Sequence, residues 1–94
     1  MEAKDNVITK LTFQFALDII KYCEGLQDDK KFVIANQLLK SGTSIRANIR
    51  EAQNAESKAD FIHKFKIAAK ETEETIYWLE IGRASCRERV YSSV

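Results

Sequence analysis

The sequence predicts an all-α fold, an antiparallel up-down helical bundle in which three long helices are present. The chain has 94 residues, no proline and only three glycines, so few residues interrupt a helix. Apolar residues recur three and four positions apart in three successive segments, which is the spacing of one helix face. A chain of this length forms one domain with a modest core.

The first helix is expected over residues 12–25. Thr12 is placed to cap its N-terminus, and Gly25 is placed to end it. The predicted apolar stripe consists of Phe13, Ala16, Leu17, Ile20 and Cys23, widened by Ile19, Tyr22 and Leu26.

The second helix is expected over residues 29–55, with Asp28 or Asp29 as its cap. Its apolar or small positions alternate in spacing between three and four, like a heptad seam. These positions are Ala35, Leu38, Gly42, Ile45, Ile49 and Ala52. Because the seam keeps its phase, we expect one continuous helix; the alternative is a break at Gly42.

Four poor helix formers stand in a row at residues 41–44, inside this second helix. Glycine alone costs about 1 kcal/mol relative to alanine in a helix interior. A sequence that keeps small residues there is expected to need the close approach of another helix or of a partner. The candidate packing or oligomer contacts are Ser41, Gly42, Thr43, Ile45 and Ile49.

The third helix is expected over residues 57–80. Ser57 and Asp60 match the capping pattern that precedes an apolar run. The predicted stripe consists of Phe61, Phe65, Ala68, Thr72, Ile76 and Leu79, with Ile62 and Ala69 beside it. The short link to the second helix makes the two antiparallel neighbours.

Residues 81–94 differ from the rest of the chain because they lack apolar periodicity. The amino-acid sequence of this segment resembles the translation of a sequencing adapter. We therefore expect the helical domain to span residues 1–80 and the last fourteen residues to be a cloning or sequencing remnant. The alternative is a genuine basic tail.

Charge is unevenly distributed along the chain, although the net charge is only +1. Residues 30–70 carry nine Lys or Arg against three acids, whereas residues 71–80 carry four glutamates and no cation. A basic middle can face a polyanion, or it can pair with acidic neighbours. The candidate nucleic-acid-binding residues are Lys40, Arg46, Arg50, Lys58, Lys64, Lys66 and Lys70.

Signals for catalysis and metal binding are weak, and we expect neither an enzyme nor a cofactor. His63 is the one histidine, and Cys23 and Cys86 give no zinc spacing. Glu71 and Glu74 share a helix face and could ligate Mg²⁺, as in helical nucleotide hydrolases. Such a site needs further carboxylates on a facing helix, for which Glu51 and Glu56 are candidates by residue type only.

Residues 13–16, 37–52, 60–62 and 74–79 together resemble the bacterial four-helix bundle proteins that include the 23S rRNA intervening-sequence proteins. Relatives of that family include the accessory variability proteins of diversity-generating retroelements. The resemblance runs from about residue 7 to residue 80. It implies a cytoplasmic, non-enzymatic protein that assembles into a ring-like homopentamer. For the accessory relatives it also implies a basic surface that meets nucleic acid and a reverse transcriptase.

One departure from the family pattern is expected: the sequence after Leu79 does not predict the fourth helix of the family. Without it, an apolar groove is expected to stay open, with marginal stability or compensating assembly as the result. Three functions therefore compete: an oligomeric bundle protein that binds RNA, DNA or a nucleic-acid enzyme; a purely structural interaction module; and, least favoured, a Mg²⁺-dependent hydrolase. No membrane-spanning run of about 18 apolar residues is present.

Overall fold

Three long helices form an antiparallel bundle, which confirms the predicted all-α class. The structure is a computed structural model that describes the backbone of residues 5–92 and the side chains of residues 7–85. A short π-helix, η1 (Asp5–Thr9), leads into α2 (Lys10–Asp28), and α3 (Phe32–Gln53) and α4 (Lys58–Ser92) follow. The described residues contain no strand.

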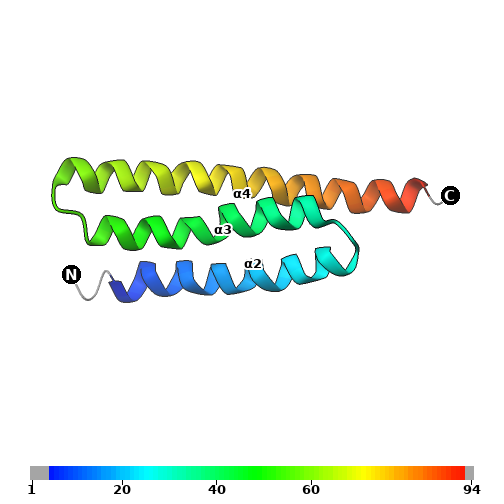
Figure 1. Cartoon of the computed structure of the whole chain (residues 1–94), viewed down its shortest axis with the longest axis horizontal. Helices are drawn as coiled ribbons and strands as arrows, with labels where there is room; N and C mark the ends of the chain where they lie inside the picture. Colours follow the sequence, from blue (N-terminus) through cyan, green and yellow to red (C-terminus); the bar gives the residue numbers. More distant parts are fainter. Residues whose placement is uncertain (1–4, 93–94) are drawn as a thin grey trace.

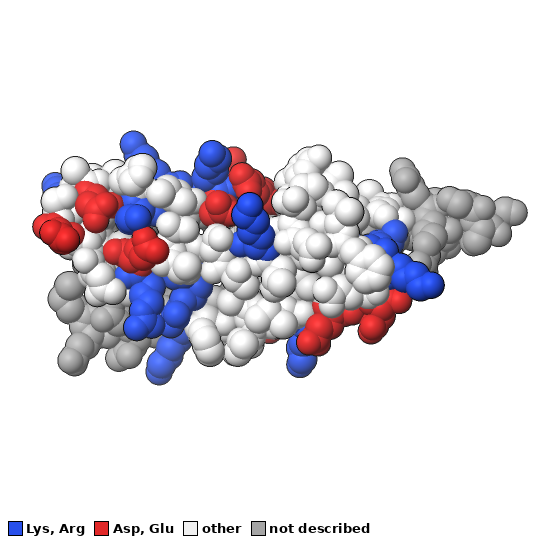
Figure 2. Space-filling view, in the orientation of Figure 1, with Lys and Arg blue, Asp and Glu red and all other residues white. Residues whose placement is uncertain are grey.

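Helix α3 packs against both α2 and α4 and is the middle member of the bundle (Figure 1). The molecule is a rod of 56 × 21 × 16 Å (Figure 2), and α4 extends past the other two helices at its C-terminal end. Within the described part of the chain, no helix is both long enough and apolar enough to cross a membrane.

The connection between α2 and α3 lies later than the sequence predicted, so the predictions for Gly25 and the two aspartates are wrong. Helix α2 passes through Gly25 and ends at Asp28. Lys30 then takes the left-handed conformation, with φ of 64°. The Lys31 N–H donates to the Leu26 carbonyl at 2.8 Å, and the Lys30 N–H donates to the Gln27 carbonyl at 2.9 Å. This pair of bonds is a Schellman closure, which satisfies the last carbonyls of α2.

Thr12 does not cap a helix, because the helical backbone already begins before it in η1. Its hydroxyl instead donates to the Ile8 carbonyl oxygen at 2.9 Å. Threonine commonly bonds back to the preceding turn in this way, and that bond gives no signal of where a helix starts.

The heptad-like seam of α3 is confirmed in full, and α3 is continuous through Gly42. Each of the six seam positions is buried, and Leu38 is fully enclosed. The seam keeps one face of α3 against its two neighbours, which is why four poor helix formers do not break it.

Gly42 is a point of close approach between α2 and α3. A β-carbon added at Gly42 would lie 2.9 Å from Cγ2 and 3.3 Å from Cβ of Ile19. Ile19 is β-branched and its χ1 is restricted, so its side chain has little freedom to move away. Glycine at this position therefore lets α2 rest directly on α3.

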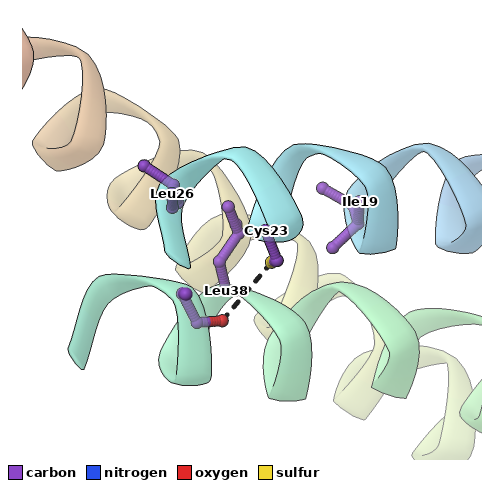
Figure 3. Close-up of a cluster of buried hydrophobic side chains, with 5 residues drawn as sticks. Ile19, Cys23, Leu26 and Leu38 are labelled. Atoms are coloured by element: carbon purple, nitrogen blue, oxygen red, sulfur yellow. Dashed lines mark hydrogen bonds between the residues drawn. The ribbon is translucent and has the colours of Figure 1, made fainter. Parts of the chain in front are cut away.

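The core cluster beside this contact joins α2 to the first half of α3 (Figure 3). It contains Ile19, Cys23, Leu26, Ala35 and Leu38, with Trp78 and Leu79 of α4 packed against it. The Cys23 thiol lies 3.4 Å from the Ala35 carbonyl oxygen and donates to it. Cys23 was predicted to be a small core residue, and its burial confirms this.

A buried polar contact joins α3 to α4. The hydroxyl oxygens of Ser41 and Thr75 are hydrogen-bonded at 3.0 Å, and the Thr75 hydroxyl also bonds to the Glu71 carbonyl at 2.8 Å. Thr75 was missing from the predicted stripe, although it is 1 % exposed. The predicted stripe contained Thr72, which is exposed, and overlooked Thr75, whose hydroxyl is satisfied by its own helix and by Ser41.

Helix α4 starts as predicted but continues beyond residue 80. The Asp60 N–H donates to the Ser57 hydroxyl at 3.1 Å, which confirms the cap. The helical backbone then runs unbroken to Ser92. Gly82 is buried, and a β-carbon added there would lie 3.5 Å from Cγ2 of Ile34. That residues 81–94 are a cloning or sequencing remnant stays a prediction; residues 93–94 lie outside the described residues.

The buried face of α2 is displaced from the predicted stripe. Ile19, Cys23 and Leu26 are buried, whereas Phe13, Leu17 and Ile20 are 50, 43 and 39 % exposed. Helix α2 carries apolar residues around more than half of its circumference, and the described neighbours cover only part of it. Part of the remaining apolar surface forms an exposed apolar stripe, which is Phe13, Leu17 and Ile20; Leu11 and Tyr22 are also exposed but lie outside this stripe.

The close contact at Gly42 predicts opposite effects for the same substitution at two glycines. Gly42→Ala should lower the free energy of unfolding by about 1 kcal/mol, because overpacking against Ile19 outweighs the gain in helix propensity. Gly25→Ala should raise it by about 0.5–1 kcal/mol, because nothing lies within 4 Å of a β-carbon there. Thermal and urea unfolding followed by circular dichroism would measure both changes. Equal stabilisation by the two substitutions would contradict the assigned contact.

Burial predicts that Cys23 is chemically protected. Removal from water raises the pKa of the Cys23 thiol, so the reactive thiolate is disfavoured in the folded state. In the native protein iodoacetamide should leave Cys23 unmodified near neutral pH, and denaturant should expose it. Site-resolved mass spectrometry would give both rates, and equal labelling with and without denaturant would refute the packing.

Candidate nucleic-acid interface

Most of the predicted cations lie at the end of the bundle where α3 ends and α4 begins. The two helices are antiparallel and joined by residues 54–57, so their charged turns meet there. Figure 2 shows blue side chains gathered over that half of the molecule, with red ones between them. Lys40 is exposed and lies earlier in α3 than Arg46 and Arg50, nearer the middle of the rod.

Arg46 is held against α2. Its guanidinium carbon lies 5.2 Å from the centre of the Phe13 ring, within the range of a cation–π contact. Its Nε is buried and has no hydrogen-bond partner among the described residues. Arg46 is therefore half-buried and partly fixed, rather than a freely extended phosphate contact.

Arg50 follows one turn later and is exposed beside a polar pocket. This pocket has a volume of about 250 Å³ and is lined by Thr9, Arg50, Gln53 and Asn54. The Thr9 hydroxyl donates to Gln53 Oε1 at 3.0 Å, which ties η1 to the end of α3.

Lys64 of α4 is neutralised by an ion pair with Glu51 of α3. Its Nζ lies 2.8 Å from a carboxylate oxygen of Glu51. The hydrogen bond and charge of Glu51 raise the pKa of Lys64 above its ordinary value. Lys64 therefore contributes little net positive charge to the surface.

The other three candidate cations on α4 are exposed. They are Lys58, Lys66 and Lys70, of which the last two are four residues apart on one face. Six of the seven candidates thus form two groups and not one patch. Arg46 and Arg50 lie on the side of α3 that faces α2, and the other four lysines lie on α4, whereas Lys40 lies apart from both groups on α3.

The predicted packing residues are used mostly within the chain. Ser41, Gly42, Ile45 and Ile49 are buried between the helices, so they are not available for a contact with another subunit. Thr43 is half-buried, and its hydroxyl donates to the Leu39 carbonyl at 2.7 Å.

The candidate catalytic groups remain dispersed. Glu71 is half-buried and Glu74 is exposed, while Glu51 is engaged by Lys64. In the described part of the chain, no three His, Cys, Asp or Glu residues lie close enough to hold a metal ion together. His63 is exposed, and the side chain of Cys86 lies outside the described residues.

A second, apolar pocket at the same end was not predicted. It has a volume of about 310 Å³ and is lined by Val7, Ile8, Gln53, Phe61 and Phe65. The Phe61 and Phe65 rings are 4.9 Å apart at an interplanar angle of 41°. The sequence showed that the two phenylalanines are four residues apart, but this spacing predicted core residues and not a pocket. The sequence could not show that Val7 and Ile8 of η1 also line this pocket, because that contact depends on tertiary structure.

Comparisons with known proteins identify relatives of this chain. The family model described as 23S rRNA-intervening sequence protein matches residues 4–87. A crystal structure at 1.70 Å resolution, of a protein with unknown function from the S23 ribosomal protein family of Bacteroides thetaiotaomicron VPI-5482, is 49 % identical. The match covers 87 % of this chain and 74 % of that chain, with a TM-score of 0.82. The comparison with curated proteins found no match.

Proposed function

This chain belongs to the 23S rRNA-intervening sequence protein family, and we propose that it is a non-enzymatic bundle protein that binds RNA or DNA through exposed cations. The observation that carries the proposal is that exposed cations of two helices, Arg50 on α3 and Lys58, Lys66 and Lys70 on α4, lie in the same half of the rod. A nucleic-acid enzyme such as a reverse transcriptase is a further candidate partner for the same surface.

Binding of this kind relies on phosphate contacts. Exposed lysines and arginines release condensed counterions when they neutralise phosphates, so affinity falls steeply with salt and depends little on base sequence. The charge of one chain is modest, and a homo-oligomer repeats it around the assembly axis. We include such assembly, a pentamer by the family resemblance, in the proposal.

Charge reversal on α4 tests the phosphate contacts. Lys66→Glu combined with Lys70→Glu should weaken binding to RNA and DNA alike and reduce the salt dependence by about one per lost contact. Fluorescence anisotropy across a salt series would measure both quantities. The single substitution Arg50→Glu should also lower the affinity for RNA and DNA, but by less than the double substitution does.

The matched control reverses two exposed lysines outside this end, Lys21 and Lys30. Lys21→Glu combined with Lys30→Glu makes the same change in net charge, yet it should preserve most of the affinity. Equal losses in the two double variants would mean that only net charge matters. Absence of binding by the unaltered protein at low salt would refute the function.

A protein-interaction module is the second candidate, favoured by the exposed apolar stripe on α2. Phe13, Leu17 and Ile20 lie on one helix face and together leave apolar surface in water. Contiguous exposed apolar patches commonly mark protein contacts. The stripe supports homo-oligomer formation, whether or not the assembly binds nucleic acid.

The stripe predicts the effect of a charge placed in it. Leu17→Glu should reduce the mass of the assembly in sedimentation velocity, because a carboxylate would have to lose water at the interface. Val33→Glu is the matched control, since Val33 is exposed near the start of α3 and outside the stripe. An assembly of unchanged mass in Leu17→Glu would exclude the stripe as the subunit contact.

A further inference from the structure

We propose that the two adjacent pockets at the α3–α4 end bind one nucleotide unit of a single-stranded nucleic acid. The base enters the apolar pocket at Phe61 and Phe65, and the phosphate lies at Arg50. This inference rests on the nucleic-acid function proposed above and specifies the kind of strand.

The apolar pocket has the properties of a base-binding site. Phe61 is 39 % exposed and lines the pocket, and the half-buried Phe65 lines it beside Phe61. Val7 and Ile8 of η1 form the opposite wall. A volume of about 310 Å³ lies at the small end of the range for ligand pockets, which suits a single planar base. Stacking on an aromatic ring tolerates any base.

The polar pocket supplies the complement for a phosphate. Arg50 offers a planar guanidinium that can bond two phosphate oxygens at once. Asn54 lines the same pocket with a side-chain amide that can donate hydrogen bonds, whereas the hydroxyl proton of Thr9 is already donated to Gln53. The nearest acidic residue in sequence, Glu51, is turned toward Lys64 on the α4 side and does not oppose an anion here.

Gln53 joins the two pockets, because its side chain lines both. The Thr9 hydroxyl bonds to Gln53 Oε1 and so fixes the orientation of the carboxamide. The amide nitrogen of that group is then directed away from Thr9 as a donor for a base edge or a phosphate oxygen.

This juxtaposition selects the occupant. An apolar protein segment would fill the pocket at the phenylalanines but would make no use of Arg50. A nucleotide presents an anion and an aromatic plane together, and it satisfies both pockets. A duplex keeps its bases stacked inside the helix, so only an unpaired strand can place a base against Phe61.

Phe61→Leu tests the stacking part of the proposal. Anisotropy with a labelled oligouridylate of about ten nucleotides should show at least a fivefold loss of affinity, as expected when one base–aromatic stack is lost. Binding of a duplex of the same length should not change. Phe32→Leu is the matched control, because Phe32 is an exposed residue at the opposite end of α3, about 30 Å away.

A mononucleotide titration tests the site without a polymer. Uridine monophosphate and uridine would be compared by their effects on the aromatic NMR resonances of the protein. The monophosphate should bind more tightly, and Arg50→Gln should remove that difference while leaving uridine binding unchanged. Circular dichroism would verify that each variant is folded.

The outcomes separate this inference from the proposed function. If the protein bound single strand and duplex equally, and if Phe61→Leu had no more effect than Phe32→Leu, the pocket would be excluded as a base-binding site. The proposed binding of phosphates by the exposed cations would still stand. Mononucleotide binding without binding of any strand would identify a free-nucleotide site and would overturn both this inference and the proposed function. If an amphipathic helical peptide displaced a bound naphthalene-sulfonate dye from the pocket and the mononucleotide did not, the occupant would be a protein segment and the proposal would be wrong.

Discussion

The contact between Gly42 and Ile19 is the constraint on which the bundle depends. It sets the distance between α2 and α3, and the first core cluster forms around it. The absence of a side chain at one position lets two helix backbones approach, so neighbouring apolar residues interdigitate without voids. The Schellman closure at Lys30 then turns the chain so that α3 returns along α2.

The second interface uses polar contacts to fix its geometry. Ser41 and Thr75 are hydrogen-bonded in the interior, and Lys64 pairs with Glu51 nearer the surface. A buried hydroxyl pair is satisfied only when the two helices lie at one register, because a shift would leave a polar group without a partner. This register brings Phe61 and Phe65 beside Gln53 and so creates the apolar pocket.

The features that support function are a consequence of the antiparallel arrangement. Cations distant in the sequence meet because α3 ends where α4 begins, and η1 closes the same end of the rod. Apolar surface on α2 stays exposed for another reason, since its neighbours in the bundle cover only part of a broadly apolar helix. The proposed nucleic-acid contact and the proposed assembly would thus use different surfaces, and the two could coexist.

The sequence by itself determined the helical class, the continuity of α3, its six seam positions and the cap at Ser57, because these depend on local periodicity and local hydrogen bonds. Tertiary structure alone decided which side of α2 is buried, why Thr75 is in the core and which cations remain available. Arg46 is stacked on Phe13 and Lys64 is paired with Glu51, and no local pattern contains those partners. Burial and charge pairing depend on residues that the fold brings together from distant parts of the chain.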